Sequence, residues 1–209
     1  MIVNEIFLSI QGESSSVGLP TIFVRFTGCN LRCSYCDTRY AYVDGEEMSV
    51  YDILDKIKSF GYKRVCLTGG EPLIQKDIQL LIEKLADYEV SIETNGSVDL
   101  KDVVLCEKHR FVMDIKLKGS GFYDRMNFDN FKYLNERDEI KFVISNREDY
   151  DLAKEVIIRY YKLGNIIMSP VFGKLEYHNL VEWILEDRLD VRFQIQIHKI
   201  IWDKDKRGV

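Results

Sequence analysis

Three of the five cysteines of this chain lie in one short segment. Cys29, Cys33 and Cys36 have the spacing C-x-x-x-C-x-x-C, and no fourth cysteine is close to them in the sequence. Thiolates are the usual protein ligands of iron–sulfur clusters, so three of them can hold three irons of a cubane [4Fe–4S] cluster. The fourth iron is then open to a ligand that is not a side chain. The spacing therefore predicts a cluster that takes part in a chemical reaction.

Two other kinds of site also use cysteines. A disulfide framework is disfavoured by the odd number of cysteines and by the lack of a secretion signal at the start of the chain. A structural zinc site usually takes four protein ligands, so it would need a distant fourth ligand: Cys66, Cys106 or a histidine. Cys66 and Cys106 have apolar neighbours, which predicts that both are small residues of the core.

The composition is that of a globular protein, because 46% of the 209 residues are hydrophobic and 30% are charged. No apolar run approaches the roughly 20 residues of a membrane span. The net charge of −5 disfavours a nucleic-acid-binding protein, which usually has a basic face. With three prolines and no Gly/Ser-rich linker, residues 1–209 are expected to form a single domain. Thiols that must stay reduced predict a cytoplasmic location.

The elements that position the cysteines are indicated by apolar, β-branched runs that alternate with amphipathic stretches. Continuous apolar runs are typical of strands that are buried on both faces. The runs predict strands at 21–27, 64–68, 90–94, 111–115, 139–145, 166–169 and 192–198, after a short strand at 5–10.

Helices are predicted between these strands. Residues 49–52 have the form of a capping box, and Gly61 is a stop signal for the helix that they begin. Apolar stripes at 78–85 and 153–160 predict two more helices, and others are expected at 175–186 and 128–135. This alternation indicates a parallel sheet with right-handed crossovers. Eight full units need about 250 residues, so the predicted fold is α/β, an incomplete parallel (β/α) barrel.

In such a fold the functional residues gather at the carboxyl ends of the strands. The cysteine segment follows the strand at 21–27, and Gly69-Gly70-Glu71-Pro72 follows the strand at 64–68. Polar residues also follow later strands, at 94–96, 114–116 and 169–171, and His198 is expected to end the last strand. Polar or glycine-rich residues at nearly every strand end predict one shared pocket.

These residues resemble the radical S-adenosylmethionine (SAM) superfamily. Its signature C-x-x-x-C-x-φ-C has an aromatic or apolar residue at φ, where this chain has Tyr35. The G-G-E-P-like turn, a second mark of the superfamily, is matched by residues 69–72. The resemblance implies a barrel of the radical SAM type, in which SAM binds the open iron and one electron from the cluster cleaves its C5′–S bond. The protein orients and shields this chemistry, which the cofactor supplies.

The same resemblance implies which residues contact SAM. Glycines let the backbone approach the methionine group, and the Glu71 carboxylate is expected to pair with its ammonium. Tyr35 is expected to lie against the adenine. The implied set is Tyr35, Cys36, Asp37, Gly70, Glu71, Asp114, Ile115, Lys116, Ser169, Pro170, Val171 and Phe172. The chain departs from the family at 114–116, where Asp-Ile-Lys stands in place of a frequent Ser-Pro-Lys.

A closer resemblance, over essentially the whole length, is to the 7-carboxy-7-deazaguanine synthases. It rests on E-I-F-L-S-I-Q-G-E at 5–13, C-N-L-R-C-S-Y-C-D-T at 29–38 and Q-I-H-K at 196–199. That family converts 6-carboxy-5,6,7,8-tetrahydropterin to 7-carboxy-7-deazaguanine with loss of ammonia, a step toward queuosine and archaeosine in transfer RNA. It is homodimeric and needs Mg²⁺. Flavodoxin or ferredoxin is the electron donor that the superfamily implies.

The resemblance also implies a substrate site. Thr38 would be the protein ligand of Mg²⁺, a cation that prefers hard oxygen donors. Arg25 would hold the substrate carboxylate with its planar guanidinium, and Glu13 would accept N–H groups from the guanidine-like edge of the pterin. The implied contacts are Ile10, Gln11, Gly12, Glu13, Arg25, Thr68, His198 and the terminal residue Val209. From the sequence alone, Thr38 also fits a loop cap, Arg25 a surface residue and His198 a strand-end histidine.

Two other functions remain open at this point. A glycyl-radical-activating enzyme shares the cysteine segment and the small size but acts on a glycine of another protein. A non-catalytic iron–sulfur or zinc module predicts four protein ligands and no binding of SAM. Arg25 and residues 10–12 favour a small anionic heterocycle as substrate, and thus the synthase.

Overall fold

The computed structural model describes residues 1–161, 163–203 and 205–209, and its framework is a nine-stranded sheet. In chain order the strands are β1 (Ile2–Ile10), β2 (Pro20–Phe26), β3 (Glu46–Glu47), β4 (Arg64–Gly69), β5 (Glu89–Thr94), β6 (His109–Ile115), β7 (Glu139–Ile144), β8 (Asn165–Pro170) and β9 (Arg192–Phe193). They lie in the order β3-β1-β2-β4-β5-β6-β7-β8-β9. From β2 to β9 every neighbouring pair is parallel, whereas β1 is antiparallel to both β2 and β3.

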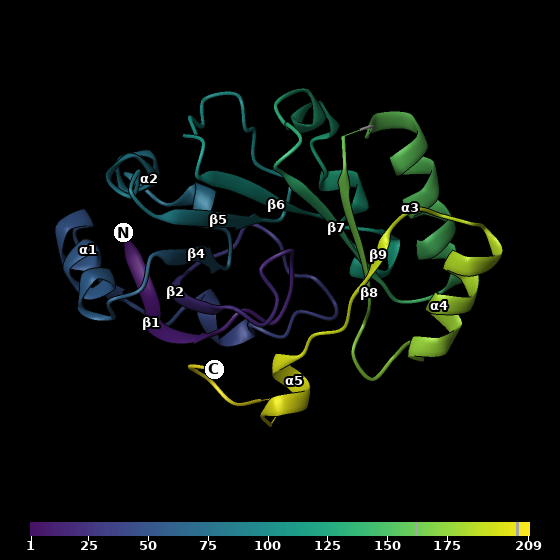
Figure 1. Cartoon of the computed structure of the whole chain (residues 1–209), viewed down its shortest axis with the longest axis horizontal. Helices are drawn as coiled ribbons and strands as arrows, with labels where there is room; N and C mark the ends of the chain where they lie inside the picture. The colour runs from purple at the N-terminus through teal and green to yellow at the C-terminus, as the bar shows by residue number, and fades with distance from the viewer. Residues whose placement is uncertain (162, 204) are drawn as a thin grey trace.

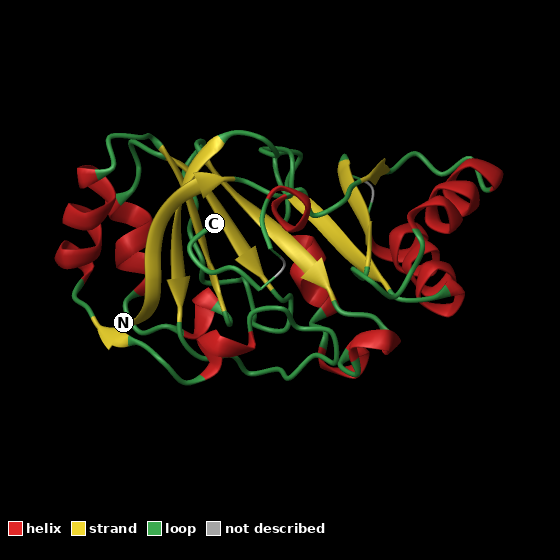
Figure 2. Ribbon diagram, turned by 90° about the horizontal axis from the view of Figure 1, so that it is seen from below, coloured by secondary structure: helices red, strands yellow, loops and turns green. Residues whose placement is uncertain are grey.

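The sheet is open, because β3 and β9 are its two edges and do not pair with each other. Figure 1 shows the strands curved into an arch, with α5 and the C-terminus at its open side. In the turned view the C-terminus lies in front of the inner face of the sheet (Figure 2). The structure therefore confirms the predicted incomplete parallel (β/α) barrel, with an antiparallel extension at its N-terminal edge.

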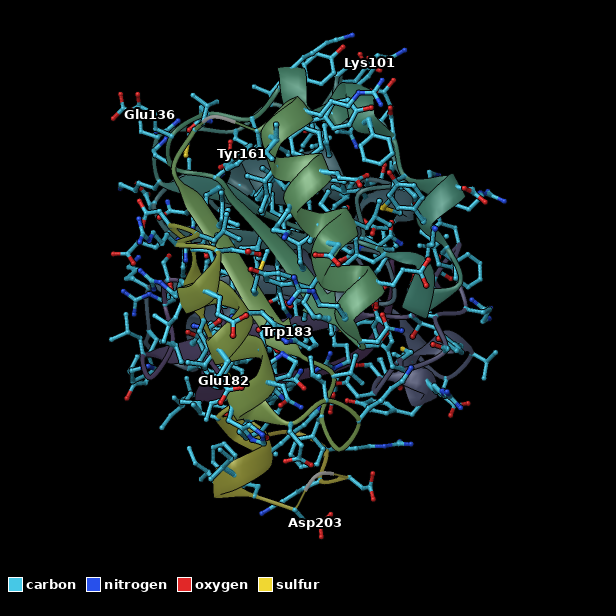
Figure 3. The ribbon with its side chains drawn as sticks, turned by 90° about the vertical axis from the view of Figure 1, so that its right-hand side faces the viewer. Lys101, Glu136, Tyr161, Glu182, Trp183 and Asp203 are labelled. Carbon is cyan, nitrogen blue, oxygen red and sulfur yellow. The ribbon has the colours of Figure 1, made fainter. Side chains whose placement is uncertain are left out.

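Four helices of the described residues cover the outer side of the arch: α1 (Val50–Ser59), α2 (Ile78–Lys84), α3 (Arg147–Tyr160) and α4 (Tyr177–Glu186). The short α5 (His198–Ile201) lies at the open side. The predicted capping box is confirmed: the Ser49 hydroxyl accepts the Asp52 N–H at 3.2 Å, and an Asp52 carboxylate oxygen accepts the Ser49 N–H at 3.1 Å. Gly61 has a φ of +73°, which suits the predicted stop. The ring centres of Trp183 of α4 and Tyr150 of α3 are 5.5 Å apart. Figure 3 views these two helices from outside and labels Trp183.

The two faces of the sheet differ in polarity. On β4, Val65 and Leu67 are fully buried in the core between the sheet and the helices, where each contributes roughly 1.5–3 kcal/mol. Successive side chains of a strand point to opposite faces, so Cys66 and Thr68 face the inside of the arch. Cys66 is fully buried, as predicted, whereas Cys106 is partly exposed and does not belong to the core. The apolar side chains of the outer face therefore form the core with the helices, and polar side chains can lie on the inner face.

Several predicted elements differ from the structure. The expected strand at 192–198 is only Arg192–Phe193, and His198 begins α5 instead of ending a strand. The reason is that the chain leaves the sheet here and binds the N-terminal segment. The Gln194 side chain accepts a hydrogen bond from the Ser14 N–H and donates one to the Ser14 carbonyl. The Ile197 N–H donates to the Gly12 carbonyl.

Two helix predictions also change. The helix expected at 175–186 begins at Tyr177, and the one expected at 128–135 is a 3-10 helix, Phe128–Lys132. Four other 3-10 helices have no sequence signal that we used: Arg39–Tyr42, Pro72–Ile74, Lys118–Ser120 and Tyr123–Arg125. Short 3-10 turns bury too few residues to produce an apolar stripe.

Among the described residues, no helix is long and apolar enough to cross a bilayer.

Candidate active site

A cavity of about 760 Å³ opens on the inner face of the arch, at the carboxyl ends of the strands. Its wall is formed by both ends of the chain as well as by the barrel. The predicted site residues on this wall are Ile10, Gln11, Gly12, Glu13, Arg25, Cys29, Cys33, Tyr35, Cys36, Asp37, Thr38, Thr68, Gly70, Asp114, Lys116, Val171, Phe172, His198 and Val209. The expected shared pocket therefore exists, and it has a volume in the range of small-molecule sites.

The cysteine segment forms one end of the cavity. Cys29, Cys33 and Cys36 are free thiols and all three line the wall. Asn95 places its amide nitrogen 3.7 Å from Cys29 Sγ, and the Leu31 N–H lies 3.4 Å from the same sulfur. N–H groups directed at a ligand sulfur are a common feature around protein-bound clusters. The donor set and its surroundings fit a [4Fe–4S] cluster.

The zinc alternative requires a different arrangement. Within residues 1–161, 163–203 and 205–209, no three His, Cys, Asp or Glu side chains converge as a single metal ion requires. A cubane takes one thiolate at each of three irons, so its ligands need not converge on one point, whereas a zinc ion draws all four ligands to itself.

The glycine pair after β4 supports the cysteine segment directly. A Cβ atom at Gly70 would lie 1.8 Å from the Gly28 carbonyl oxygen, and Gly69 has a φ of +129°. Glu71 N–H donates to the same Gly28 carbonyl at 2.9 Å. Only glycine allows this approach, so the turn fixes the start of the cysteine segment against the barrel.

The structure corrects the expectation for Glu71. Its side chain is fully buried below the turn and does not line the cavity. The carboxylate accepts hydrogen bonds from Leu73 N–H, Thr94 Oγ1 and Asn95 N–H, at 3.1, 2.9 and 2.7 Å. Burial raises the pKa of Glu71 to about 7, against the effect of these donors. Glu71 therefore joins the ends of β4 and β5 and has no free oxygen for an ammonium group.

Asp114 and Lys116, at the end of β6, form an ion pair on the cavity wall. Lys116 Nζ lies 2.7 Å from Asp114 Oδ2. Burial of the ammonium group lowers the pKa of Lys116, but the Asp114 carboxylate outweighs this effect and raises the pKa above its ordinary value. Asp114 Oδ1 and the Tyr35 hydroxyl are buried without a hydrogen-bond partner among the described residues. Buried polar atoms are normally paired, so these two atoms are suited to contact a ligand.

Besides Glu71, three residues of the implied SAM set lie away from the cavity. Ile115, Ser169 and Pro170 are buried in the barrel and do not line its wall. For Ile115 the reason is strand alternation, because it lies between two residues, Asp114 and Lys116, that do face the cavity. Their side chains are corrected from cofactor contacts to parts of the barrel, although Val171 and Phe172 remain on the wall.

Arg25 faces the cavity and not the solvent. Its Nε donates to Glu5 at 2.8 Å, and the Tyr40 hydroxyl donates to the same oxygen of Glu5 at 2.8 Å. The guanidinium also lies 5.7 Å from the centre of the Phe7 ring. With Nε engaged, the terminal nitrogens of the guanidinium remain to pair with a carboxylate.

Two further contacts order this end of the cavity. Thr68 Oγ1 donates to Glu93 at 2.8 Å, and Gln11 Nε2 donates to the other oxygen of Glu93 at 3.2 Å. A Cβ atom at Gly12 would lie 2.0 Å from His198 Nδ1, so the imidazole packs directly on this glycine. Burial lowers the pKa of His198, which leaves the ring neutral near pH 7.

Thr38 lies on the cavity wall, two residues after Cys36. Its hydroxyl donates to Asp37 Oδ1 at 2.9 Å, and the second Asp37 oxygen binds Lys199 Nζ at 2.5 Å. The hydroxyl oxygen of Thr38 is a hard donor of the type that Mg²⁺ accepts. The C-terminal tail completes this side, with the Arg207 guanidinium 4.1 Å from the Tyr40 ring centre and Val209 on the wall.

Sequence reasoning missed several residues of the cavity. They are Glu93, Lys141 and Lys199 on the cavity wall, and Glu5, which does not line the cavity but binds Arg25. Glu93 and Lys141 had a usable signal, since each is a charged residue in the interior of a largely buried strand. A charge at such a position is costly unless it has a partner or a ligand.

Comparisons with known proteins agree with this site. A family model of the radical SAM superfamily matches residues 23–184. The 7-carboxy-7-deazaguanine synthase of Clostridium acetobutylicum is 44% identical over 217 residues, covering 99% of this chain and 98% of that protein. The enzyme of the same name from Chlorobaculum tepidum is 44% identical over 214 residues, covering 99% and 96%.

A solved structure is also similar. The crystal structure of QueE from Escherichia coli aligns with a TM-score of 0.73 at 24% identity, over 92% of this chain and 93% of that chain. At this identity the likeness shows the fold, while the sequence matches show the family. The chain therefore belongs to the radical SAM superfamily and, within it, to the family of 7-carboxy-7-deazaguanine synthases.

Proposed function

We propose that this protein converts 6-carboxy-5,6,7,8-tetrahydropterin to 7-carboxy-7-deazaguanine with release of ammonia, as a lyase of 7-deazapurine biosynthesis. The observation that carries the proposal is that three free thiols and the side chains of Glu13, Arg25 and His198 line one cavity. Full-length relatives that bear the name of this enzyme support the same function. Activation of a protein glycine finds no support in these relatives.

Cys29, Cys33 and Cys36 would hold the cluster, leaving one iron for SAM. Together the two groups supply hydrogen-atom abstraction by one-electron chemistry. Asp114 Oδ1 and the Tyr35 hydroxyl are the buried polar atoms available to orient SAM, and Lys116 holds Asp114 in place. The walls on either side exclude bulk water from the space where the reacting carbon would lie.

At the other end, Arg25 would pair with the substrate carboxylate, and Glu5 and Tyr40 keep its guanidinium directed into the cavity. Thr68 and Gln11 are fixed by Glu93, so the groups that would meet the ring are ordered before it binds. Such preorganisation places the reacting hydrogen close to the cofactor without an entropy loss during the reaction. His198 is neutral and can donate or accept one hydrogen bond at the ring.

Mg²⁺ is part of the proposal, with the Thr38 hydroxyl as the protein ligand and substrate oxygens and water as the others. We also propose that the protein is a homodimer in the cytoplasm and receives electrons from a flavodoxin or ferredoxin. Its 209 residues would form one radical SAM domain with substrate-binding extensions at both ends. The bonds between Gln194 and Ser14 support the last point, because they join the two extensions to each other.

The function is tested with anaerobically purified protein that carries about four irons per chain. The protein is incubated with SAM, Mg²⁺, a chemical reductant and the tetrahydropterin, and the products are separated and weighed by mass spectrometry. We expect 7-carboxy-7-deazaguanine and ammonia in equal amounts. An iron-loaded protein that cleaves SAM but forms no deazapurine would show that the substrate is wrong.

A further inference from the structure

Lys141 is a lone cation in the middle of the buried strand β7. Its side chain is 10% exposed and lies on the cavity wall. A buried ammonium group is costly unless a close partner compensates for the lost hydration. The partner is Glu13, from the N-terminal extension, whose Oε2 accepts a hydrogen bond from Lys141 Nζ. Neither the fold nor the cofactor site described above requires a lysine at this position.

The two oxygens of Glu13 are used differently. Lys141 binds Oε2, whereas Oε1 is buried and has no hydrogen-bond partner among the described residues. The Glu13 side chain is 13% exposed and lines the cavity. Oε2 is therefore fixed by Lys141, and Oε1 can accept a hydrogen bond from a ligand in the cavity.

Three titratable groups face this carboxylate. Lys141 approaches from β7, His198 from α5 and Asp37 from the cysteine segment. Burial alone would raise the pKa of Glu13, but the Lys141 ammonium outweighs it and holds the pKa below the ordinary value. Without Lys141 the same burial would favour the protonated carboxyl, which can no longer accept two N–H groups.

Lys141 is committed to Glu13 and not to its neighbours in the sheet. Asp114 is its register partner on β6, but the bonded oxygen of Asp114 is occupied by Lys116. Glu93 is bonded by Thr68 and Gln11. The charges thus form two separate pairs, Lys116 with Asp114 near the cysteines and Lys141 with Glu13 at the substrate end.

We propose that Lys141 is a positioning residue that keeps Glu13 an ionised acceptor, and that this pair makes the cavity specific for a ring with a 2-amino, guanidine-like edge. The inference rests on the proposed function and extends it to substrate specificity. A ring with a 2-oxo group in place of the amine brings a carbonyl oxygen toward a fixed carboxylate. A site built to accept N–H donors rejects such a ring because its own acceptor is left unpaired.

The test uses two stable probes, 6-carboxypterin and 6-carboxylumazine, which differ at the 2-position: the pterin has an amino group there, and the lumazine has an oxo group with a hydrogen on N1. Their binding to the cluster-loaded protein with SAM and Mg²⁺, but no reductant, is measured by calorimetry. We expect the wild type to prefer the pterin, and Lys141→Met to bind it at least about ten-fold more weakly with most of the preference lost. Lys141→Arg, which keeps the charge, should restore the preference.

The matched control is Lys154→Met, which removes an ion-pair lysine between α3 and α4, far from the cavity wall. It should bind both probes like the wild type. If Lys141→Met does not fold or keep its iron, Glu13→Gln/Lys141→Met replaces it, because that variant leaves no buried charge alone. Equal binding of the two probes by this variant supports the proposal.

Two results would overturn it. Wild-type preference in Lys141→Met, or in the double variant, would mean that Lys141 only stabilises the fold. If the wild type binds neither probe, the cavity is not a pterin site, and the proposed role of Lys141 is wrong as well. The first result leaves the proposed function intact, so the two failures can be told apart.

Discussion

Single cysteines of this chain differ in what surrounds them, although all five are free thiols. Cys29, Cys33 and Cys36 share a cavity wall, whereas Cys66 is fully buried in β4. The spacing of the first three was readable in the sequence because cluster ligands lie close together along the chain. The contacts of Glu5 and Lys141 were not, because their partners, Arg25 and Glu13, come from other segments of the chain.

Cys33→Ala should abolish cluster assembly and all turnover, because two thiolates cannot hold three irons. Iron content and the visible absorption of anaerobically purified protein measure the effect. Cys66→Ala is the matched control and should retain its iron, since that thiol does not reach the cavity. A brown, active Cys33→Ala protein would contradict the ligand assignment.

Thr38→Ala should weaken the response of the reaction to Mg²⁺ without removing the cluster, because it deletes one hard oxygen donor. Thr38→Ser keeps the hydroxyl and should behave like the wild type. The rate is measured as a function of Mg²⁺ concentration, with iron content as a check. Identical Mg²⁺ curves for Thr38→Ala and the wild type would exclude Thr38 as the ligand.

Arg25→Lys should raise KM for the pterin by about ten-fold or more, because a point charge replaces a planar fork. The kcat should change less, since the carboxylate is remote from the reacting hydrogen. Steady-state kinetics at saturating SAM separate the two constants. An unaltered KM would show that the guanidinium does not bind the substrate.

At the scale of the elements, strand ends are joined by a few buried polar side chains. The apolar runs predicted the central strands well, because burial on both faces leaves a strong signal. The predicted strand at 192–198 is wrong beyond β9, because Gln194 and Ile197 form hydrogen bonds with the N-terminal segment in place of a strand neighbour. A periodic pattern cannot report such bonds, since the partners are far apart in the sequence.

Glu71→Gln tests the junction of β4 and β5. The amide would turn a donor toward the N–H of Asn95, so we expect a loss of about 1–3 kcal/mol in unfolding free energy. The raised pKa of about 7, against 4.5 when unfolded, adds a pH dependence. The folded protein holds this proton more tightly, so the stabilisation is complete below pH 4.5 and is lost as the pH rises through 7.

Urea unfolding of the iron-free proteins at several pH values between these limits measures both effects. The wild type should lose unfolding free energy as the pH rises through 7, and Glu71→Gln should not show this loss. Glu186→Gln, an exposed change on α4, is the control and should follow the wild type. If Glu71→Gln shows the same decline, the carboxyl is not the group that titrates.

At the scale of the whole molecule, the two ends of the chain close one side of the barrel. Residues 10–13, His198, Lys199 and residues 205–209 lie on the same cavity wall, and Gly12 packs on His198. The sequence predicted that both ends carry site residues, on the strength of a family resemblance. It did not predict how they meet, because their contacts are set by packing across the whole fold.

The central claim is that one iron of a three-cysteine cluster is free to bind SAM. Electron paramagnetic resonance of the reduced, iron-loaded protein tests it most directly, before and after addition of SAM without substrate. The account predicts a clear change in the signal of the reduced cluster, because SAM becomes a ligand of the open iron. A spectrum that does not change when SAM is added at saturating concentration would contradict the account.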